Sequence, residues 1–451
     1  MTLAAWVQAG REIAVVGLGA SGVAATRLLR ARRLPVYASD LGAGEGLETA
    51  AAALRAEGAT VELGRHDLDR IARSGGLVLS PGVPPEAPPV QAARHAGVPV
   101  RAEADLGLEV LAAVPAVIVT GTNGKTTTTA LVEHLLLAAG RRAVATGNIG
   151  TPVTEVARHD PLPEWLAVEL SSFQLHDCRH HRPVVGILTN LAPDHLDRYP
   201  RLEDYYADKA RLFLNAGPDS TWVLNADDPG VMAMAEGVAG QRVLVSLDRP
   251  ADGWYDRAAG RLVLHGRSLL DRAELLLLGD HNVANALMAA AAAAVAGATD
   301  AELAAGLRSF RALGHRLEPV ADAGGVLWIN DSKATNVAST AVALAAMDRP
   351  YVLLLGGRHK GEPYSSLLPR LRERCRAVVA YGEAEPLIMA DLGEHLPVTA
   401  AGSDWGAVVG AARALARPGD AVLLSPACSS YDMFRNYGER GARFRDAATA
   451  R

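Results

Sequence analysis

AVIVTGTNGKTTTTALVEHL, residues 116 to 135, is the stretch that decides the fold. An apolar, strand-like run at 116 to 120 leads into a glycine-rich turn, and a helical run follows the turn. This order is typical of a phosphate-binding loop, in which backbone N–H groups at a helix N-terminus surround phosphate oxygens. The turn is shorter than the usual G-x-x-x-x-G-K-[ST], because Val119 stands at the first glycine position. A plain glycine turn is the alternative.

Each residue of this turn has an expected contact with ATP. Backbone N–H groups from Gly121 to Gly124 can surround phosphate oxygens, and Lys125 can reach the β- and γ-phosphates. Thr126 can offer its hydroxyl group to Mg²⁺. The predicted ATP contacts in the turn are therefore Gly121, Thr122, Asn123, Gly124, Lys125 and Thr126, and we also expect a contact from Thr127, the next residue along the chain.

Lysine is rare in this chain, and one lysine lies in the turn. Lysine and arginine total 45, and 45 − 4 leaves 41 arginines beside Lys125, Lys209, Lys333 and Lys360. An ammonium group is compact and its nitrogen can lose a proton, whereas a guanidinium group stays planar and charged. Lysines that fall inside motifs are therefore candidates for roles that arginine cannot fill, and chance retention is the alternative for any single one.

Outside the loop, apolar strand-like runs alternate with alanine- and leucine-rich helical runs along the whole chain. This alternation predicts an α/β protein built from parallel sheets covered by helices. Interruptions of the pattern predict three domains, comprising residues 1–102, 103–312 and 313–451. The apolar run at 286 to 298 is too short to span a membrane and predicts a buried helix.

The composition excludes some classes of partner. The formal charge is −5, and no basic block of the kind that follows a nucleic-acid backbone is present, so we expect no nucleic acid. No signal peptide or membrane span is evident, and we expect no membrane partner. Three cysteines without metal or redox spacing fit a reducing, cytoplasmic location. HDCRHH (176 to 181) has the composition of a zinc site but lacks a second ligand pair.

A second glycine motif lies near the N-terminus. Gly17, Gly19 and Gly22 form G-x-G-x-x-G between a strand and a helix, and Asp40 follows about 20 residues further on. Taken alone, the motif predicts an NAD-dependent oxidoreductase. Glycines at a helix N-terminus can approach any diphosphate, however, and a tight packing turn is a further alternative.

Polar side chains also follow the strands of the second and third domains. Glu169 ends an apolar run, and Asn190, Asp194 and His195 follow the next one. Such strand ends face the ligand crevice of an open α/β sheet, where Glu169 could hold Mg²⁺. In the third domain, the corresponding residues are Asp331, Lys333, Lys360 and Ser429.

Together these motifs resemble the Mur ligases, ATP-dependent amide-forming enzymes with three domains. The resemblance rests on TGTNGKTTT (120 to 128), ELSSFQL (169 to 175), TNLAPDHLDRY (189 to 199), GDHNVANALMA (279 to 289), NDSKATN (330 to 336) and SPACSSYDMFRNYGERG (425 to 441). It implies an N-terminal Rossmann-like sheet, a central P-loop ATPase-like sheet and a C-terminal Rossmann-like sheet. The third-domain motifs resemble the branch that adds D-glutamate to UDP-N-acetylmuramoyl-L-alanine in bacterial peptidoglycan precursor synthesis.

The resemblance also implies roles for individual residues. The UDP-sugar would contact Gly19, Ala20, Ser21, Asp40, Ser80, Gly82 and Asn148, and ATP would also contact Asn282, Arg316, Asp331 and Lys333. D-Glutamate would contact Thr335, Lys360, Ser429 and Phe434. The catalytic residues would be Lys125, Glu169, His195 and Lys209, with Mg²⁺ held near Thr126, Glu169, His195 and Lys209. In the resembling enzymes the lysine equivalent to Lys209 is carbamylated by CO₂. The resemblance also leads us to expect a monomer located in the cytoplasm.

Overall fold

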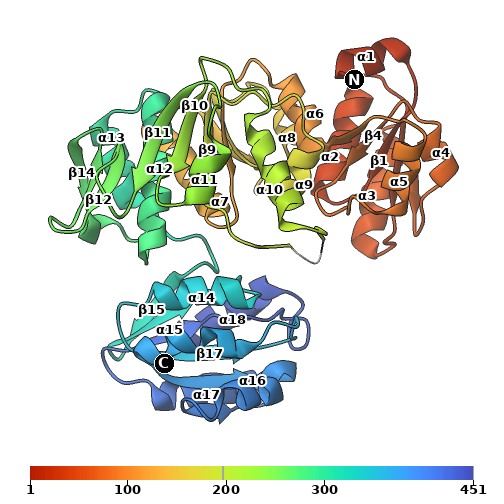
Figure 1. The fold of residues 1–451 in the computed structure, drawn as a ribbon. Coiled ribbons are helices and arrows are strands. Elements are labelled where there is room, and N and C mark those ends of the chain that lie inside the picture. Colours follow the sequence, from red (N-terminus) through yellow and green to blue (C-terminus); the bar gives the residue numbers. More distant parts are fainter. Residues whose placement is uncertain (196–197, 450–451) are drawn as a thin grey trace. The chain divides into compact units, whose positions relative to one another are not determined.

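The structure is a computed structural model, and it describes residues 1–195 and 198–449. The chain forms two compact units. The first unit comprises Met1–Glu274 and Ala284–Ser309, and the second comprises Leu275–Val283 and Phe310–Arg451. The first unit holds two sheets and the second holds one (Figure 1). The domain boundaries predicted after residues 102 and 312 stay predictions, because the first two sheets fall in one unit.

The N-terminal sheet is entirely parallel, in the order β3-β2-β1-β4-β5. Its strands are β1 (Ile13–Val16), β2 (Val36–Asp40), β3 (Thr60–Leu63), β4 (Gly76–Leu79) and β5 (Val100–Ala102), and its helices are α1 (Leu3–Ala9), α2 (Ala20–Ala31), α3 (Glu45–Ala56), α4 (Leu68–Ala72), α5 (Pro88–His95) and α6 (Glu103–Val110). Consecutive residues of β1 enter different cores: Ile13 and Val15 belong to one, Ala14 and Val16 to the other. Both faces of the sheet are therefore buried, as expected for parallel strands.

The central sheet has nine strands in the order β14-β13-β12-β11-β10-β9-β6-β8-β7, of which only the β12–β13–β14 end is antiparallel. The strands are β6 (Ala116–Thr120), β7 (Ala143–Gly147), β8 (Trp165–Glu169), β9 (Val185–Leu188), β10 (Thr221–Asn225), β11 (Gln241–Ser246), β12 (Gly253–Asp256), β13 (Arg261–Leu264) and β14 (Arg267–Asp271). The helices are α7 (Lys125–Ala138), α8 (Val153–Val156), α9 (Ser172–His176), α10 (Leu202–Ala210), α11 (Pro229–Met234), α12 (Asp280–Val295) and α13 (Asp300–Ser309). The strand order places the ends of β8 and β9 on either side of β6.

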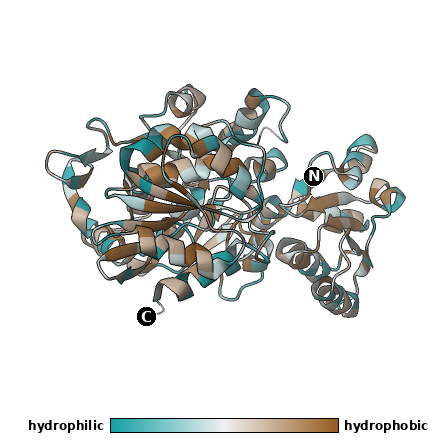
Figure 2. Ribbon diagram, turned by 90° about the horizontal axis from the view of Figure 1, so that it is seen from below, coloured by the Kyte–Doolittle hydropathy of each residue, from teal (hydrophilic) through white to brown (hydrophobic). Residues whose placement is uncertain are grey.

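The sheet of the second unit has the order β15-β16-β20-β17-β18-β19, with β15 antiparallel to β16 and the other pairs parallel. Its strands are β15 (Glu318–Ala323), β16 (Val326–Asn330), β17 (Tyr351–Gly356), β18 (Cys375–Tyr381), β19 (Val398–Ala400) and β20 (Ala421–Leu424), and its helices are α14 (Val337–Ala345), α15 (Leu368–Arg374), α16 (Glu385–Leu392), α17 (Trp405–Leu415) and α18 (Tyr437–Thr449). Figure 2 shows hydrophobic strands between helices that carry hydrophilic residues.

The predicted α/β class with parallel sheets is confirmed by these three sheets. The apolar run at 286 to 298 falls largely within α12, whose residues Ala286 to Ala293 are fully or almost fully buried. Within 1–195 and 198–449, no helix combines the length and the apolar character needed to cross a bilayer.

Candidate functional site

The glycine-rich turn joins β6 to α7, as the sequence predicts. Gly121 has φ 141°, and a Cβ atom there would lie 2.0 Å from Thr189 Oγ1, so only glycine fits. The segment after β9 braces the turn, because Thr122 N donates to Asn190 O at 2.9 Å and Asn123 N donates to Asn190 Oδ1 at 2.9 Å. The turn is therefore held in shape by its neighbouring strand end before any phosphate arrives.

Two of the four lysines lie at this turn. Lys125 Nζ donates to Gly121 O at 3.0 Å and to Thr122 O at 2.8 Å. Lys209, on α10 and only 1% exposed, donates from Nζ to Gly121 O at 2.6 Å. Burial, and secondarily the positive charge of Lys125, lower the pKa of Lys209 to about 6. Burial at this position therefore favours the neutral primary amine of Lys209 over its ammonium form.

Glu169 ends β8 close to the phosphate turn. It is 2% exposed, and its Oε1 accepts a hydrogen bond from Asn148 Nδ2 at 2.9 Å. Its Oε2 is buried and has no hydrogen-bond partner among the described residues. A buried carboxylate oxygen without a partner is costly, and a hard cation such as Mg²⁺ prefers this kind of ligand. Glu169 therefore fits a magnesium site beside the turn, and Asn148, predicted to contact the UDP-sugar, orients it.

An aromatic cluster surrounds the predicted catalytic histidine. The His195 ring lies 5.1 Å from the Phe173 ring and 6.0 Å from the Tyr205 ring, and its backbone has φ 55°. Tyr205 lies on α10, where its ring is 4.5 Å from Lys209 Nζ. The cluster therefore links His195 to the helix that carries Lys209. Residues 196 and 197, which belong to the TNLAPDHLDRY motif, lie outside the described residues.

The N-terminal sheet carries a cavity of about 470 Å³ at the carboxyl ends of its strands. Its lining includes Gly19, Ala20, Ser21, Asp40, Ser80 and Gly82, all predicted to contact the UDP-sugar, together with His66 and an apolar wall formed by Leu41, Pro81, Val83, Pro84, Ala87, Pro88 and Pro89. A Cβ atom at Gly22 would lie 1.7 Å from Gly17 O, so this glycine is needed for close packing of α2 on the turn. The volume and the mixed lining are typical of a small-molecule site.

Asp40 shapes this cavity through its carboxylate. Its Oδ2 accepts from Leu18 N at 2.7 Å and its Oδ1 accepts from Gly42 N at 2.7 Å. His66 also lines this cavity, and its Nδ1 lies 2.8 Å from Ser39 Oγ. Burial lowers the pKa of His66. A histidine whose burial disfavours the charged form and a carboxylate thus line the part of the cavity near the ends of β2 and β3.

The predicted residues Asp331, Lys333, Lys360 and Ser429 of the second unit follow β16, β17 and β20, whereas Arg316 precedes β15 and Asn282 lies near the start of α12. Asp331 follows β16, accepts from Ser425 Oγ at 2.8 Å, and has a pKa raised to about 7 by burial. Lys333 Nζ donates to Tyr437 Oη at 3.2 Å. Arg316 immediately precedes Leu317, whose N donates to Asp331 Oδ1 at 3.2 Å. Asn282, at the start of α12, donates to Leu278 O at 2.7 Å.

The residues predicted to contact D-glutamate lie on neighbouring loops of the same unit. Lys360 is exposed in the loop after β17, and Ser429 follows β20 with its Oγ 3.3 Å from Arg358 O. Thr335 stands just before Asn336, which caps α14, and the Phe434 ring lies 5.2 Å from the Trp405 ring. The unit therefore offers a cation, hydroxyl groups and an aromatic ring in one set of loops.

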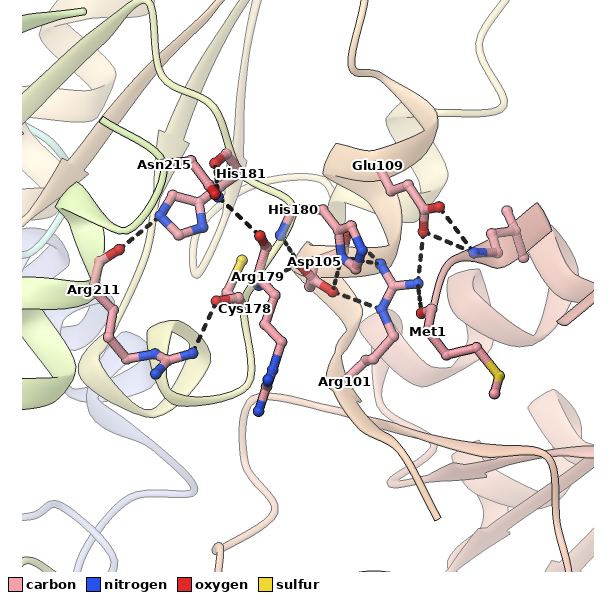
Figure 3. Close-up of polar contacts among 11 residues, drawn as sticks. Met1, Arg101, Asp105, Glu109, Cys178, Arg179, His180, His181, Arg211 and Asn215 are labelled. Atoms are coloured by element: carbon pink, nitrogen blue, oxygen red, sulfur yellow. Dashed lines mark hydrogen bonds and ion pairs between the residues drawn. The ribbon is translucent and has the colours of Figure 1, made fainter. Parts of the chain in front are cut away.

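The HDCRHH tract takes part in a buried network between α6 and the loop after α9 (Figure 3). Asp105 Oδ2 accepts from Arg101 Nε at 2.6 Å and lies 2.9 Å from His180 Nδ1, while His181 Nε2 lies 2.8 Å from Arg211 O. Burial raises the pKa of the Cys178 thiol well above its usual value. These contacts give the tract a structural role in joining the N-terminal sheet to the central one.

Four residues of these sites were not predicted from the sequence. His66 lines the N-terminal cavity, and Tyr205 Oη donates to Thr122 Oγ1 at 3.2 Å beneath the phosphate turn. Asn285 Oδ1 lies 3.2 Å from Thr128 Oγ1, and the fully buried Arg440 joins Ser332 Oγ to Cys428 O. Asn285 lies in the GDHNVANALMA motif and Arg440 in the SPACSSYDMFRNYGERG motif, so the sequence could have pointed to both. No motif marks His66 or Tyr205.

Comparison with known proteins agrees with this arrangement. Three family models match in order: the Mur ligase MurD-like N-terminal domain at residues 11–102, the Mur ligase middle domain at 119–293 and the Mur ligase glutamate ligase domain at 315–428. A UDP-N-acetylmuramoylalanine--D-glutamate ligase of Anaeromyxobacter dehalogenans is 43% identical over 98% of both chains. One of Rubrobacter xylanophilus is 42% identical over 98% of this chain and 99% of its own.

The fold is also similar to that of solved structures. A UDP-N-acetylmuramate-alanine ligase of Thermotoga maritima aligns with a TM-score of 0.62, at 19% identity, over 97% of this chain and 98% of its own. A mostly parallel sheet with a glycine-rich turn of the phosphate-loop type, and a second sheet with a cavity of about 470 Å³, are typical of an α/β nucleotide-binding protein. The chain belongs to the Mur ligase family.

Proposed function

We propose that this chain joins D-glutamate to UDP-N-acetylmuramoyl-L-alanine with conversion of ATP to ADP and inorganic phosphate, in the cytoplasmic part of bacterial peptidoglycan precursor synthesis. The observation that carries the proposal is the presence, in one compact unit, of a phosphate turn and a separate cavity of about 470 Å³. One site suits ATP and the other suits the UDP of a second substrate. The printed names of the relatives from Anaeromyxobacter dehalogenans and Rubrobacter xylanophilus support the same activity.

The chemistry of amide formation explains why the reaction needs ATP. A carboxylate does not form an amide with an amine in neutral water, because oxide is a poor leaving group. Transfer of the γ-phosphoryl group of ATP to the substrate carboxylate gives an acyl phosphate, and the amine of D-glutamate then displaces inorganic phosphate. Catalysis of phosphoryl transfer depends mainly on positioning and on neutralising charge.

The central sheet would supply the groups for phosphoryl transfer. The backbone N–H groups of the turn would bind phosphate oxygens, and Lys125 would exchange its carbonyl contacts for the β- and γ-phosphates. Thr126, Glu169 and, near them, His195 and Lys209 would hold Mg²⁺, which neutralises the charge on the phosphates when bound. Within this set, Glu169 Oε2 is the carboxylate oxygen with no partner among the described residues.

The second unit would bind the amino acid and part of ATP. Lys360 and Ser429 would bind the carboxylates of D-glutamate, with Thr335 and Phe434 beside them, and Asn282, Arg316, Asp331 and Lys333 would contact ATP. A cation and hydroxyl groups are suited to a dicarboxylate because they supply charge-assisted hydrogen bonds.

Release of inorganic phosphate tests the proposal. We expect release from ATP to require both UDP-N-acetylmuramoyl-L-alanine and D-glutamate, with little release when L-glutamate, L-lysine or meso-diaminopimelate replaces D-glutamate. Equal rates with another amino acid would contradict the proposed specificity. A rate of phosphate release that does not depend on either substrate would instead indicate an ATP-driven switch protein.

A further inference from the structure

The loop that carries Lys360 is attached to the loop that carries Ser429. Arg358 N donates to Ser429 O at 2.8 Å, and Ser429 N donates to Arg358 O at 3.2 Å, forming an antiparallel bridge. The bridge aligns the two backbones, but it leaves the chain beyond Arg358 to be positioned by other contacts. Lys360 itself is exposed.

A line of three side chains continues from this bridge. His359 Nδ1 lies 2.9 Å from Tyr364 Oη, and Tyr364 Oη lies 2.9 Å from Cys428 Sγ. His359 immediately precedes Lys360, and Cys428 immediately precedes Ser429. The tyrosine hydroxyl group therefore joins the neighbours of two residues assigned to D-glutamate.

Packing alone does not explain this hydroxyl group. The Tyr364 side chain is 1% exposed and belongs to the core on one face of the sheet, where a phenylalanine ring could pack as well. The same unit contains Tyr351, also 1% exposed, whose hydroxyl group has no hydrogen-bond partner among the described residues. A buried tyrosine in this unit can thus lack polar partners, whereas Tyr364 has one on each loop.

The far end of the Lys360 loop is also fixed. Glu362 Oε2 accepts from Val337 N at 2.9 Å at the start of α14, two residues after Thr335. Tyr364 N donates to Asp391 Oδ2 at 2.8 Å. The loop from His359 to Tyr364 is therefore attached on one side to the Ser429 loop and on the other to the Thr335 segment, with Lys360 between the two attachments.

We propose that His359, Tyr364 and Cys428 are positioning residues that set the Lys360 and Ser429 loops at the spacing required by D-glutamate. This inference rests on the proposed function and adds to it three residues to which that function assigns no contact with ATP or the substrates. A loop held in its binding conformation loses less entropy when the ligand arrives, so the line of hydrogen bonds contributes to affinity for the amino acid.

Steady-state kinetics of Tyr364→Phe tests the proposal, with Tyr351→Phe as the matched control. Loss of one hydrogen-bonded hydroxyl group is expected to raise the KM for D-glutamate about fivefold. The kcat and the KM values for ATP and UDP-N-acetylmuramoyl-L-alanine are expected to stay within about twofold of the wild type. Tyr351→Phe removes a hydroxyl group without a partner and should leave all four constants unchanged.

Two further variants separate positioning from general damage to the fold. His359→Phe keeps a planar ring and should raise the KM for D-glutamate by a similar factor, whereas Cys428→Ser keeps a hydrogen-bonding atom and should restore most of the affinity lost in Cys428→Ala. The double variant of His359→Phe and Tyr364→Phe should be no worse than Tyr364→Phe alone, because His359→Phe removes only a hydrogen bond that Tyr364→Phe already removes.

The outcomes distinguish this proposal from the proposed function. A wild-type chain that does not use D-glutamate would overturn both. If the wild type uses D-glutamate, two results would overturn the positioning role alone. One is an unchanged KM for D-glutamate in Tyr364→Phe, and the other is a rise in the KM for ATP as large as the rise in the KM for D-glutamate. If Tyr364→Phe fails to fold, unchanged kinetics in the half-buried His359→Phe would overturn it equally.

Discussion

Lys125 and Lys209 donate hydrogen bonds from Nζ to the same carbonyl oxygen, that of Gly121, at 3.0 Å and 2.6 Å. Two ammonium groups at one acceptor repel each other, and Lys209 is the more deeply buried of the two. The burial, and secondarily the repulsion by Lys125, explain why the pKa of Lys209 falls to about 6. A lysine that is neutral at neutral pH can react with CO₂, which an arginine cannot do.

Lys209→Arg is expected to lower kcat by about two orders of magnitude or more, because a guanidinium group cannot form the anionic carbamate. Lys209→Ala should recover part of its activity when acetate is added, since the missing anion can then come from solution. Circular dichroism and UDP binding should match the wild type in both variants. An active arginine variant, or an unmodified mass at Lys209 in active enzyme under CO₂, would refute the carbamate.

Lys360→Ala is expected to raise the KM for D-glutamate about tenfold or more, because a lysine that binds a substrate carboxylate through a charged hydrogen bond contributes to its affinity. The KM for ATP should stay close to that of the wild type. Initial rates of phosphate release at varied D-glutamate and varied ATP measure both constants. A higher KM for ATP alone would place Lys360 at the nucleotide instead.

Asp40→Asn is expected to raise the Kd for UDP about tenfold, because the amide would point an N–H group at Leu18 N or Gly42 N and disturb the turn. Calorimetric titration with UDP measures the effect, and the KM for ATP should not change. Asp69→Asn, at an exposed position on α4, is the matched control. Binding of NADH that is lost in Asp40→Asn would restore the oxidoreductase interpretation of the glycine motif.

Glu103→Gln is expected to gain thermal stability relative to the wild type as the pH rises. Burial raises the pKa of Glu103 from 4.5 to about 7, against the lowering by hydrogen bonds from Thr154, and its Oε2 has no partner among the described residues. Between these values the folded state binds more protons than the unfolded state, so the wild type loses stability as the pH rises. The loss is at most about 3.4 kcal/mol, which is 2.5 pKa units at 1.36 kcal/mol per unit.

Calorimetric melting of the wild type and of Glu103→Gln from pH 5 to pH 8 checks this expectation. The difference in Tm should grow in favour of glutamine up to about pH 7 and then level off. Glu236→Gln, at an exposed position, should show no such trend. A constant difference across this range would mean that Glu103 is ionised in the folded chain throughout.

Local sequence was sufficient for the features that depend on short-range geometry. The turn at 121 to 124, the strand before it and the helix after it were predictable, because glycine conformations, a helix N-terminus and alternation of apolar residues are set by neighbours along the chain. The parallel α/β class followed from the same alternation. Asp331, Lys333, Lys360 and Ser429 were singled out because they follow apolar strands, whereas Thr335 and Phe434 were implied only by the family resemblance.

Contacts between distant strand ends were decided by the tertiary structure. Lys209 meets Gly121 across 88 residues, and by its local sequence it was an ordinary surface lysine. His66 enters the N-terminal cavity because β3 pairs with β2, and Tyr364 reaches both His359 and Cys428 because β17 pairs with β20. Strand order depends on how crossover helices pack on the sheet as a whole, so no local pattern specifies which loops become neighbours.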